Sequence, residues 1–402
     1  MLLDWNYSLN YLIMQFFLTG ATGFLGGEIL VELTKRTEVT KIFCLVRALN
    51  ETSAQARIEK IFALHGDYFD RKKVVPVVGD LTDENLEKRL SVNDSIAGVN
   101  NIIHAAANTS FTKIFDDNVE NVNIRGTKQL LSWAQQLKFL DLFVYVGTAA
   151  ICGASIKNAL ITEELSPNLA AKHLVKYSYT KMIGELLLKE YLPADKVLVV
   201  RPSIIMGDTR AWVPRSYVIL WALAAINQLR LFPANGHSDL DIISIDYATK
   251  SIIALLFSSK RKHNVYHISS GLVSSTTPEK VTNTINSHFS DKPQFKFVSK
   301  DLLTSMRHWS KNGRTVDIDN PLYQYREYLD YWISLFGDNS KLRILFHALE
   351  PYINFIELGQ VFDNRKLLED TDLEPSVPAH VYMTNSVKYL ENINIFEGAI
   401  DP

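Results

Sequence analysis

Only two of the 402 residues are cysteines, Cys44 and Cys152. Two cysteines cannot build a disulfide framework and offer no thiolate cluster for a metal, so we expect two small buried hydrophobic residues and predict no metal site. Net charge is also small, because 42 lysine and arginine residues face 44 aspartate and glutamate residues, which leaves −2. A balance this close to neutral gives no support to a nucleic-acid-binding function.

Long hydrophobic runs are missing as well. The longest, Tyr217–Ile226, has ten residues, whereas a membrane-spanning helix needs about 20. The segment from Met1 to Met14 contains Asp4 and no basic residue, which argues against a signal peptide. We interpret it as an accessory extension or the product of an upstream start site, and we expect a cytoplasmic enzyme. A hydrophobic content of 47% is enough to form a buried core, which argues against an intrinsically disordered chain.

From residue 15 to about 205, short β-branched or aromatic runs alternate with amphipathic segments. The predicted strands are 15–19, 41–46, 73–78, 100–104, 142–147 and 196–200, and the predicted helices are 25–35, 52–65, 118–137 and 175–191. Strands that are apolar throughout and alternate with helices indicate a parallel sheet covered on both faces. Right-handed crossovers then give an α/β, doubly wound, Rossmann-like fold.

The pattern changes after Pro202. We therefore predict an extension over 1–14, a dinucleotide-binding domain over 15–206, and a smaller substrate-binding subdomain over 207–402. Within the subdomain, 240–246 predicts a strand, 247–257 a helix and 265–269 a further strand, so that about 240–270 returns to the main sheet. An aromatic stripe at helical spacing favours packing on a core over contact with a membrane or acyl chain. Its members are Tyr325, Tyr328, Leu329 and Trp332.

A glycine-rich turn follows the first predicted strand and opens the first predicted helix. Gly20 allows the tight turn, Gly23 allows backbone to approach a pyrophosphate, and Gly26 allows close packing of helix on strand. The helix N-terminus adds unpaired N–H groups and the positive end of its dipole. The predicted dinucleotide-binding residues of this turn are Thr19, Gly20, Thr22, Gly23, Phe24, Leu25 and Gly26.

The end of the second strand distinguishes NADPH from NADH. An acidic residue there binds the ribose of NAD, whereas an arginine accommodates the 2′-phosphate of NADP. Arg47 stands at this position, 21 residues after Gly26, and no acid appears before Glu51. We predict NADPH, with Arg47 and Arg57 facing the phosphate. Residues at the carboxyl ends of the next two strands are expected at the adenine and inner ribose, namely Asp80, Leu81, Ala105, Ala106 and Ala107.

The predicted catalytic pair is Tyr177 and Lys181, which lie four residues apart and so share a helix face. A nearby ammonium lowers the pKa of a phenol toward the working range, and such a tyrosine can donate a proton to a carbonyl oxygen as hydride reaches the carbon. Thr148, after the fifth strand, could bind the same oxygen, and Asn123 could support the lysine through a water. Tyr179 lacks a lysine four residues on.

Together these residues resemble the extended short-chain dehydrogenase/reductase superfamily, and most of all its thioester reductase and fatty acyl-CoA reductase group, which includes the plant male-sterility proteins. The resemblance covers about 15–257 and continues loosely toward 390. It rests on the runs 19–26, 44–47, 77–81, 103–107, 123–127 and 201–207.

The resemblance implies that Thr148, Tyr177 and Lys181 form the catalytic set, and that Asn123, Tyr177 and Lys181 also contact the cofactor. It adds three cofactor-binding residues from the last run, Pro202, Ser203 and Ile204. The chain departs from the group at Gly147, where a serine is frequent, and at Lys176, where an asparagine is frequent.

The leading hypothesis is an NADPH-dependent reductase of an acyl thioester, carried on coenzyme A or on the phosphopantetheine of a carrier protein, with aldehyde or alcohol as product. Residues 207–239 would form the acyl groove and the aromatic region 320–360 its cover. A second hypothesis keeps the fold and changes the substrate to a sugar nucleotide, sterol or flavonoid-type alcohol or ketone, as a reductase, epimerase or dehydratase. A third is a non-enzymatic dinucleotide-sensing regulator, which the intact Thr148, Tyr177 and Lys181 disfavour.

Overall fold

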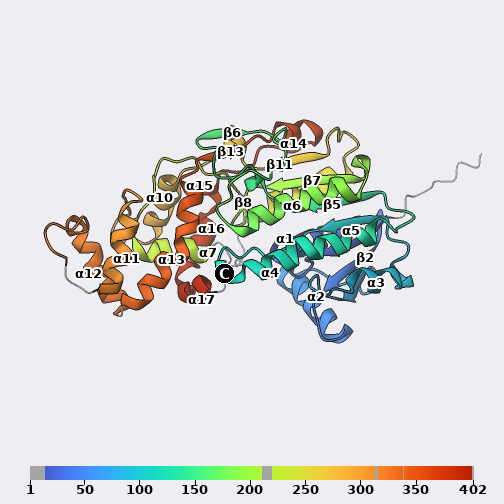
Figure 1. The fold of residues 1–402 in the computed structure, drawn as a ribbon, viewed down its shortest axis with the longest axis horizontal. Helices are drawn as coiled ribbons and strands as arrows, with labels where there is room; N and C mark the ends of the chain where they lie inside the picture. Colours follow the sequence, from blue (N-terminus) through green and yellow to red (C-terminus); the bar gives the residue numbers. More distant parts are fainter. Residues whose placement is uncertain (1–13, 211–219, 313–315, 338, 401–402) are drawn as a thin grey trace, which may run out of the picture. The chain divides into compact units, whose positions relative to one another are not determined.

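The computed structural model describes residues 14–210, 220–312, 316–337 and 339–400 (Figure 1). Seven strands form one sheet in the order β11-β7-β5-β4-β1-β2-β3. The pairs β1–β2, β2–β3, β1–β4, β4–β5 and β7–β11 are all parallel. This order confirms the predicted doubly wound, Rossmann-like sheet. The strands are β1 (Met14–Thr19), β2 (Val39–Val46), β3 (Val74–Val78), β4 (Asn101–His104), β5 (Leu142–Val146), β7 (Val197–Pro202) and β11 (Val265–Ile268).

Helices connect these strands and begin where local sequence favours a start. Asn50 caps α2 (Glu51–His65), because its side chain accepts the Ser53 N–H at 2.9 Å. The other connecting helices include α1 (Phe24–Thr34), α3 (Leu86–Ser91), α6 (Lys176–Tyr191) and α8 (Ile245–Phe257). The buried ring of Phe17 on β1 packs on Trp133, with centroids 4.7 Å apart.

The segment predicted as one helix over 118–137 is interrupted. It consists of α4 (Asp116–Glu120), a π-helical stretch at Asn121–Gly126 and α5 (Thr127–Ala134). A π-helical turn inside an α-helix redirects side chains and occurs frequently at functional sites. Asn123 lies within it.

Much of the chain after β7 is helical. Its short strands pair in parallel as β8 with β10 and β9 with β12, while β13 pairs in parallel with β6, which precedes β7. These strands are β6 (Ala159–Ile161), β8 (Ile204–Ile205), β9 (Leu231–Phe232), β10 (Ile242–Ile243), β12 (Lys296–Phe297) and β13 (Gln360–Phe362). The helices are α7 (Leu220–Leu229), α9 (Gly271–Ser274), α10 (Pro278–His288), α11 (Leu302–Asn312), α12 (Arg326–Phe336), α13 (Asn339–Ile356), α14 (Arg365–Asp370), α15 (Ala379–Tyr382), α16 (Thr384–Val387) and α17 (Ile395–Ile400).

The predicted strand over 240–246 was wrong in extent. Only Ile242–Ile243 pair as a strand, and α8 already begins at Ile245, because Ser244 accepts the Tyr247 N–H and caps the helix. The predicted core packing of the aromatic stripe is confirmed: Tyr328, Leu329 and Trp332 are buried, and the Trp332 indole donates to the Leu229 carbonyl at 2.7 Å.

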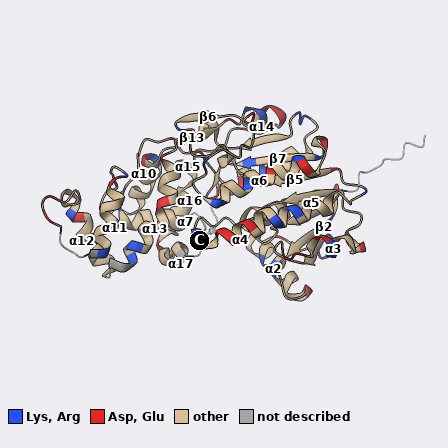
Figure 2. Ribbon diagram, in the orientation of Figure 1, with Lys and Arg blue, Asp and Glu red and all other residues tan. Residues whose placement is uncertain are grey.

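The chain separates into two compact units. The first comprises residues up to Ala107, Arg125–Val146 and Leu187–Leu198; the second comprises Asn108–Ile124, Gly147–Leu186 and residues from Val199 onward. Acidic and basic residues are interspersed along both (Figure 2). In the described ranges, no helix is long and apolar enough to cross a membrane, and no three potential ligands gather in a metal-binding group. The predicted domain boundary at 206 stays a prediction.

Candidate active site

The glycine-rich turn between β1 and α1 has the shape of a phosphate-binding loop. Gly20 has a φ of +78°, and a Cβ there would come within 2.7 Å of the Ala106 nitrogen. A Cβ on Gly26 would collide with the Gly20 carbonyl. A Cβ on Gly23, in contrast, would meet only the Gly20 carbonyl oxygen, at 3.2 Å, among the described atoms. Two glycines are therefore required by packing, whereas Gly23 leaves an open approach to the backbone.

The N-terminus of α1 fits an anionic ligand. Gly23 is its N-cap, and in the described part of the chain no side chain caps this end and no acidic residue occupies its first turn. Unpaired N–H groups and the positive end of the helix dipole thus meet at the open side of the loop. A pyrophosphate fits this arrangement.

Hydrogen bonds join the carboxyl ends of β1 and β4. The Thr19 hydroxyl lies 2.7 Å from Nδ1 of His104 and accepts the Ala106 N–H at 3.2 Å. The other ring nitrogen of His104 lies 2.9 Å from the Thr127 hydroxyl. Thr19, Gly20 and Ala106 are thereby brought together, with Ala105 and Ala107 flanking the contact, at the point where strand order reverses and doubly wound sheets bind ligands.

Arg57 reaches the edge of the loop and bonds to the backbone of Arg47. Arg47 follows β2 and is exposed, as is Arg57 on α2. The Arg57 guanidinium donates to the Arg47 carbonyl and, at 3.2 Å, to the Thr22 hydroxyl. Sequence reasoning placed both arginines near a phosphate, and the structure brings Arg57 to the loop through Thr22. The cationic side chain of Arg57 thus lies beside this part of the loop, and it is joined to Arg47 through the Arg47 backbone carbonyl.

Asp80 and Leu81 follow β3. The Asp80 carboxylate accepts the Thr82 N–H and hydroxyl, both at 2.9 Å, which fixes the turn. Leu81 is buried against Gly126, where a Cβ would come within 2.7 Å of the leucine side chain. Phe24 and Leu25 form the first residues of α1.

In the second unit, α6 presents Tyr177 and Lys181 one turn apart. Burial raises the pKa of Tyr177 to about 12. Burial also lowers the pKa of Lys181 to about 7, against the opposing effect of the Glu185 carboxylate. The sequence predicted a lowered tyrosine pKa, whereas burial raises it in the structure. A phenol that keeps its proton at neutral pH has the protonation state of a proton donor.

Asn123 is fixed by backbone groups and touches α6. Its carbonyl oxygen accepts the Asn108 N–H at 2.8 Å, and its amide donates to the Asn108 carbonyl at 2.9 Å. The same amide donates to the Thr180 hydroxyl at 3.0 Å, and that hydroxyl donates to the Tyr177 carbonyl at 2.9 Å. Asn123 therefore contacts the turn between Tyr177 and Lys181.

Thr148 follows β5 and is nearly buried. Its hydroxyl accepts the Ala150 N–H at 3.3 Å and caps a short 3₁₀ turn. The preceding Gly147 lies against α6, since a Cβ there would approach Glu185 to 3.0 Å. This contact leaves little room for a side chain at Gly147, because the Glu185 carboxylate, paired with Arg201, occupies the space.

Phe111 links Tyr177 to a cluster of aromatic side chains. The Phe111 ring lies 6.3 Å from the Tyr177 ring, 5.1 Å from Tyr352 and 5.5 Å from Phe355, measured between centroids. Trp221 of α7 packs edge-on to Tyr352 at 5.4 Å. Tyr352 and Phe355 belong to the last turn of α13, just beyond Pro351, which cannot donate a helical hydrogen bond.

The expected acyl groove lies only partly within the described residues. Residues 211–219, with the start of the run Tyr217–Ile226, fall outside them. The remainder of that run, in α7, is buried in a core cluster of the second unit. Pro202 is buried at the end of β7, whereas Ser203 and Ile204 are partly exposed beside it.

Sequence reasoning missed three residues around the site: Phe111, Glu185 and Arg201. Glu185 could have been found, because it repeats the four-residue spacing of Tyr177 and Lys181 along α6. Phe111 carries no such signal, since it lies in a loop and meets its partners only through the fold.

Comparison with known proteins gives a consistent result. The NAD-binding family described as male sterility protein matches residues 18–252. Fatty acyl-CoA reductase 1 from Rattus norvegicus is 27% identical over 352 residues, covering 74% of this chain and 67% of that protein. The Homo sapiens protein of the same name is 28% identical over 306 residues, covering 65% and 58%. The chain thus spans about two thirds or less of the length of these two relatives.

Solved structures show the same fold. The terminal R domain from the myxalamid PKS-NRPS biosynthetic pathway has a TM-score of 0.71 at 20% identity, covering 94% of this chain and 91% of the other. A thiolation-reductase di-domain from an archaeal non-ribosomal peptide synthetase has a TM-score of 0.66 at 20% identity, covering 96% and 76%.

Proposed function

The chain belongs to the male sterility protein family, whose match covers more than half of its length, and from this premise we propose that it is an NADPH-dependent reductase of acyl thioesters. The product is an aldehyde, or an alcohol after a second reduction. The observation that carries the proposal is the placement of Tyr177 and Lys181 one turn apart on the same face of α6, where burial raises the pKa of the phenol. Similarity to proteins named fatty acyl-CoA reductase 1 supports an acyl thioester as the substrate.

The residues of the first unit fit a dinucleotide. The open backbone at Gly23 and the uncapped N-terminus of α1 would hold the pyrophosphate. Arg47 and Arg57 would face the 2′-phosphate, which is why we propose NADPH rather than NADH. When bound, NADPH supplies the hydride for reduction.

Side chains of the second unit handle the oxygen and its proton. Thr148 and Tyr177 would bind the thioester carbonyl oxygen and stabilise the negative charge that develops on it. Tyr177 donates its proton to that oxygen, and the Lys181 ammonium stabilises the phenolate that results. Asn123 holds the α6 turn between them through Thr180.

The net reaction is balanced. A C–H bond forms at the thioester carbon, the oxygen gains a proton, and the hemithioacetal then breaks its C–S bond. Thioester, NADPH and a proton are converted into aldehyde, thiol and NADP⁺. The aromatic ring of Phe111, beside Tyr177, would contact the part of the apolar acyl chain that adjoins the reacting carbon.

The test follows NADPH oxidation with acyl-CoAs of increasing chain length, compared with NADH and with the variant Tyr177→Phe. We expect turnover with NADPH and a loss of at least about 100-fold in kcat for Tyr177→Phe, the range for removal of a general acid. Tyr179→Phe, on the same helix, is the matched control and should keep its activity. Reduction of ketones or sugar nucleotides but of no thioester would overturn the proposal.

A further inference from the structure

The face of α6 that carries Tyr177 and Lys181 continues into a third polar residue. Glu185 lies four residues after Lys181, so the two side chains project from neighbouring turns of one face. Both residues are almost fully buried, with 2% of Lys181 and 3% of Glu185 exposed. An ammonium and a carboxylate at this spacing attract each other far more strongly than in water, because little solvent screens them.

The Glu185 carboxylate is held in place by Arg201 of β7. Nε of Arg201 lies 3.0 Å from Oε1 and 3.2 Å from Oε2, and Nη2 lies 2.7 Å from Oε2. The third nitrogen, Nη1, donates to the carbonyls of Glu163 and Leu165. On the other strand, a Cβ at Gly147 would come within 3.0 Å of Oε1. These contacts leave the carboxylate little freedom to move away from α6.

Three titratable groups near this pair are uncharged at neutral pH. Burial raises the pKa of Tyr177 and that of Cys152 to about 12. Burial, together with the Arg201 charge, lowers the pKa of His267 to about 3. These three side chains therefore cannot offset the charge on Lys181.

Further charges lie beyond Arg201 and pair with one another. The Glu163 carboxylate lies 3.9 Å from the Lys366 ammonium. Asp363 pairs with Arg365 at 2.6 Å. Among the described residues of this network, Glu185 is the acid that shares a helix face with Lys181.

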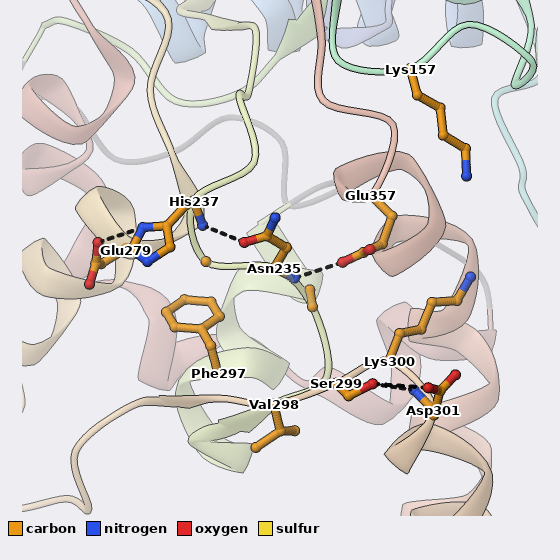
Figure 3. A pocket seen from close by; sticks show the side chains of 12 residues that line it. Lys157, Asn235, His237, Glu279, Phe297, Val298, Ser299, Lys300, Asp301 and Glu357 are labelled. Atoms are coloured by element: carbon orange, nitrogen blue, oxygen red, sulfur yellow. Dashed lines mark hydrogen bonds and ion pairs between the residues drawn. The ribbon is translucent and has the colours of Figure 1, made fainter.

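The carboxylates of a surface pocket in the second unit provide a contrast. This pocket of about 690 Å³ carries Glu279, Glu357 and Asp301 on its wall (Figure 3). Glu279 pairs with the His237 ring at 3.2 Å, but the two side chains are 49% and 80% exposed. Water and salt screen such charges, so Glu279 is a suitable control for the buried Glu185.

We propose that Glu185 is a positioning residue that keeps the Lys181 ammonium charged at neutral pH, while Arg201 holds its carboxylate in place. The inference rests on the proposed function, in which a charged Lys181 stabilises the phenolate formed at Tyr177. Burial favours the neutral amine and lowers the pKa of Lys181 to about 7, although Glu185 opposes this effect. Without the carboxylate, Lys181 would lose its proton at a lower pH.

The test removes the carboxylate without leaving Arg201 unpaired. In the double variant E185Q/R201M, two neutral side chains of similar size replace the pair, a change that proteins tolerate better than the loss of one partner. We expect the alkaline decline of kcat, measured with NADPH and an acyl-CoA, to move to lower pH by about one pH unit, which lowers kcat at pH 7.5 roughly tenfold. At pH values below both midpoints kcat should recover.

Two controls separate the charge from the structure. Glu279→Gln removes an exposed carboxylate of the same unit and should leave the midpoint in place. Lys181→Arg carries a guanidinium that stays charged, so E185Q/R201M added to this variant should produce no alkaline decline. A uniform loss of kcat at every pH, with the midpoint unchanged, would overturn the proposal and leave the pair a purely structural role.

A second measurement needs no turnover. The unfolded chain keeps the Lys181 proton up to about pH 10.5, whereas the folded double variant should release it at lower pH than the unaltered protein. The rise of stability with pH should therefore begin at lower pH in E185Q/R201M, and Lys181→Met should abolish the rise in both backgrounds. Denaturation midpoints in steps from pH 5 to 9 measure this onset. An unchanged onset would overturn the inference, whereas failure of the unaltered protein to reduce any thioester would overturn the proposed function.

Discussion

Arg201 holds Glu185 in a buried ion pair, with Nη2 2.7 Å from Oε2 and Nε 3.0 Å from Oε1. The two side chains are only 2% and 3% exposed. Arg201 also donates to the carbonyls of Glu163 and Leu165, so its charge is almost fully satisfied. Because Glu185 lies one turn from Lys181 and against Gly147, the pair fixes the surface from which the predicted catalytic residues project.

Glu185→Gln should lower the free energy of unfolding by about 3–5 kcal/mol, since it leaves a buried guanidinium without its counter-charge. Chemical denaturation with the folded state checked by circular dichroism measures the loss. Asp372→Asn is the control, because it removes the exposed pair with Lys260 and should change stability little. Equal stability of the two variants would show that the buried Glu185–Arg201 pair contributes no more to the free energy of unfolding than the exposed Lys260–Asp372 pair.

The pH dependence of turnover should reflect Lys181. Its pKa is lowered to about 7 by burial, so the ammonium loses its proton as pH rises through about 7 rather than near 10.5. Activity that depends on the charged lysine therefore falls above about pH 7. In Lys181→Arg, whose guanidinium stays charged, the alkaline decline should disappear from the remaining activity. A decline that keeps its midpoint in this variant belongs to another group.

The lysine also affects folding. Between about pH 7 and 10.5 the unfolded chain binds a proton at Lys181 that the folded chain does not, so this group alone makes stability rise with pH in that window. Lys181→Met should remove the rise. Denaturation midpoints at pH 6.5 and 9 compare the two proteins directly.

Gly23 and Gly26 should respond differently to the same substitution. Gly26→Ala places a methyl group on the Gly20 carbonyl and should destabilise the fold, whereas Gly23→Ala needs only a small adjustment. The Gly23→Ala methyl would instead occupy the approach to the pyrophosphate, so this variant should fold and lose dinucleotide binding. Thermal unfolding and fluorescence titration with NADPH separate the two effects. Retained binding by Gly23→Ala would contradict the predicted role of the loop.

Arg57→Ala should reduce the preference for NADPH over NADH by about tenfold, as expected for loss of a contact to a charged group. The kcat/KM values with each dinucleotide give the ratio. Arg71→Ala is the control. Arg71 is also an exposed arginine, and it pairs with Glu59, which lies on α2 with Arg57, so its removal should leave the ratio intact. An unchanged ratio in Arg57→Ala and in Arg47→Ala would point to a different phosphate-binding residue.

The sequence predicted the seven-stranded sheet well because its strands β1 to β5 and β7 are apolar and bounded by turn residues, which are local signals. It predicted the glycine loop for the same reason. The π-helical stretch at Asn121–Gly126 was not predicted, and the side chain of Asn123 within it bonds to Asn108 and Thr180, which are 15 and 57 residues away in the sequence and carry no local signal. The sign of the Tyr177 pKa shift depends on burial, which spacing along a helix does not reveal. The cluster around Phe111 likewise joins segments separated by more than 200 residues.

The preference for long over short acyl chains should depend on Phe111. The centroid of its ring lies 6.3 Å from that of Tyr177 and 5.1 Å from that of Tyr352, so Phe111→Ala removes apolar surface beside the proposed proton donor. We expect kcat/KM for long acyl thioesters to fall about tenfold or more, and that for the shortest to fall much less, because only long chains use this surface. Phe111→Leu, which keeps most of the volume, should retain the chain-length preference, and Phe139→Ala serves as an exposed control. A uniform loss across all chain lengths would instead assign Phe111 to positioning Tyr177.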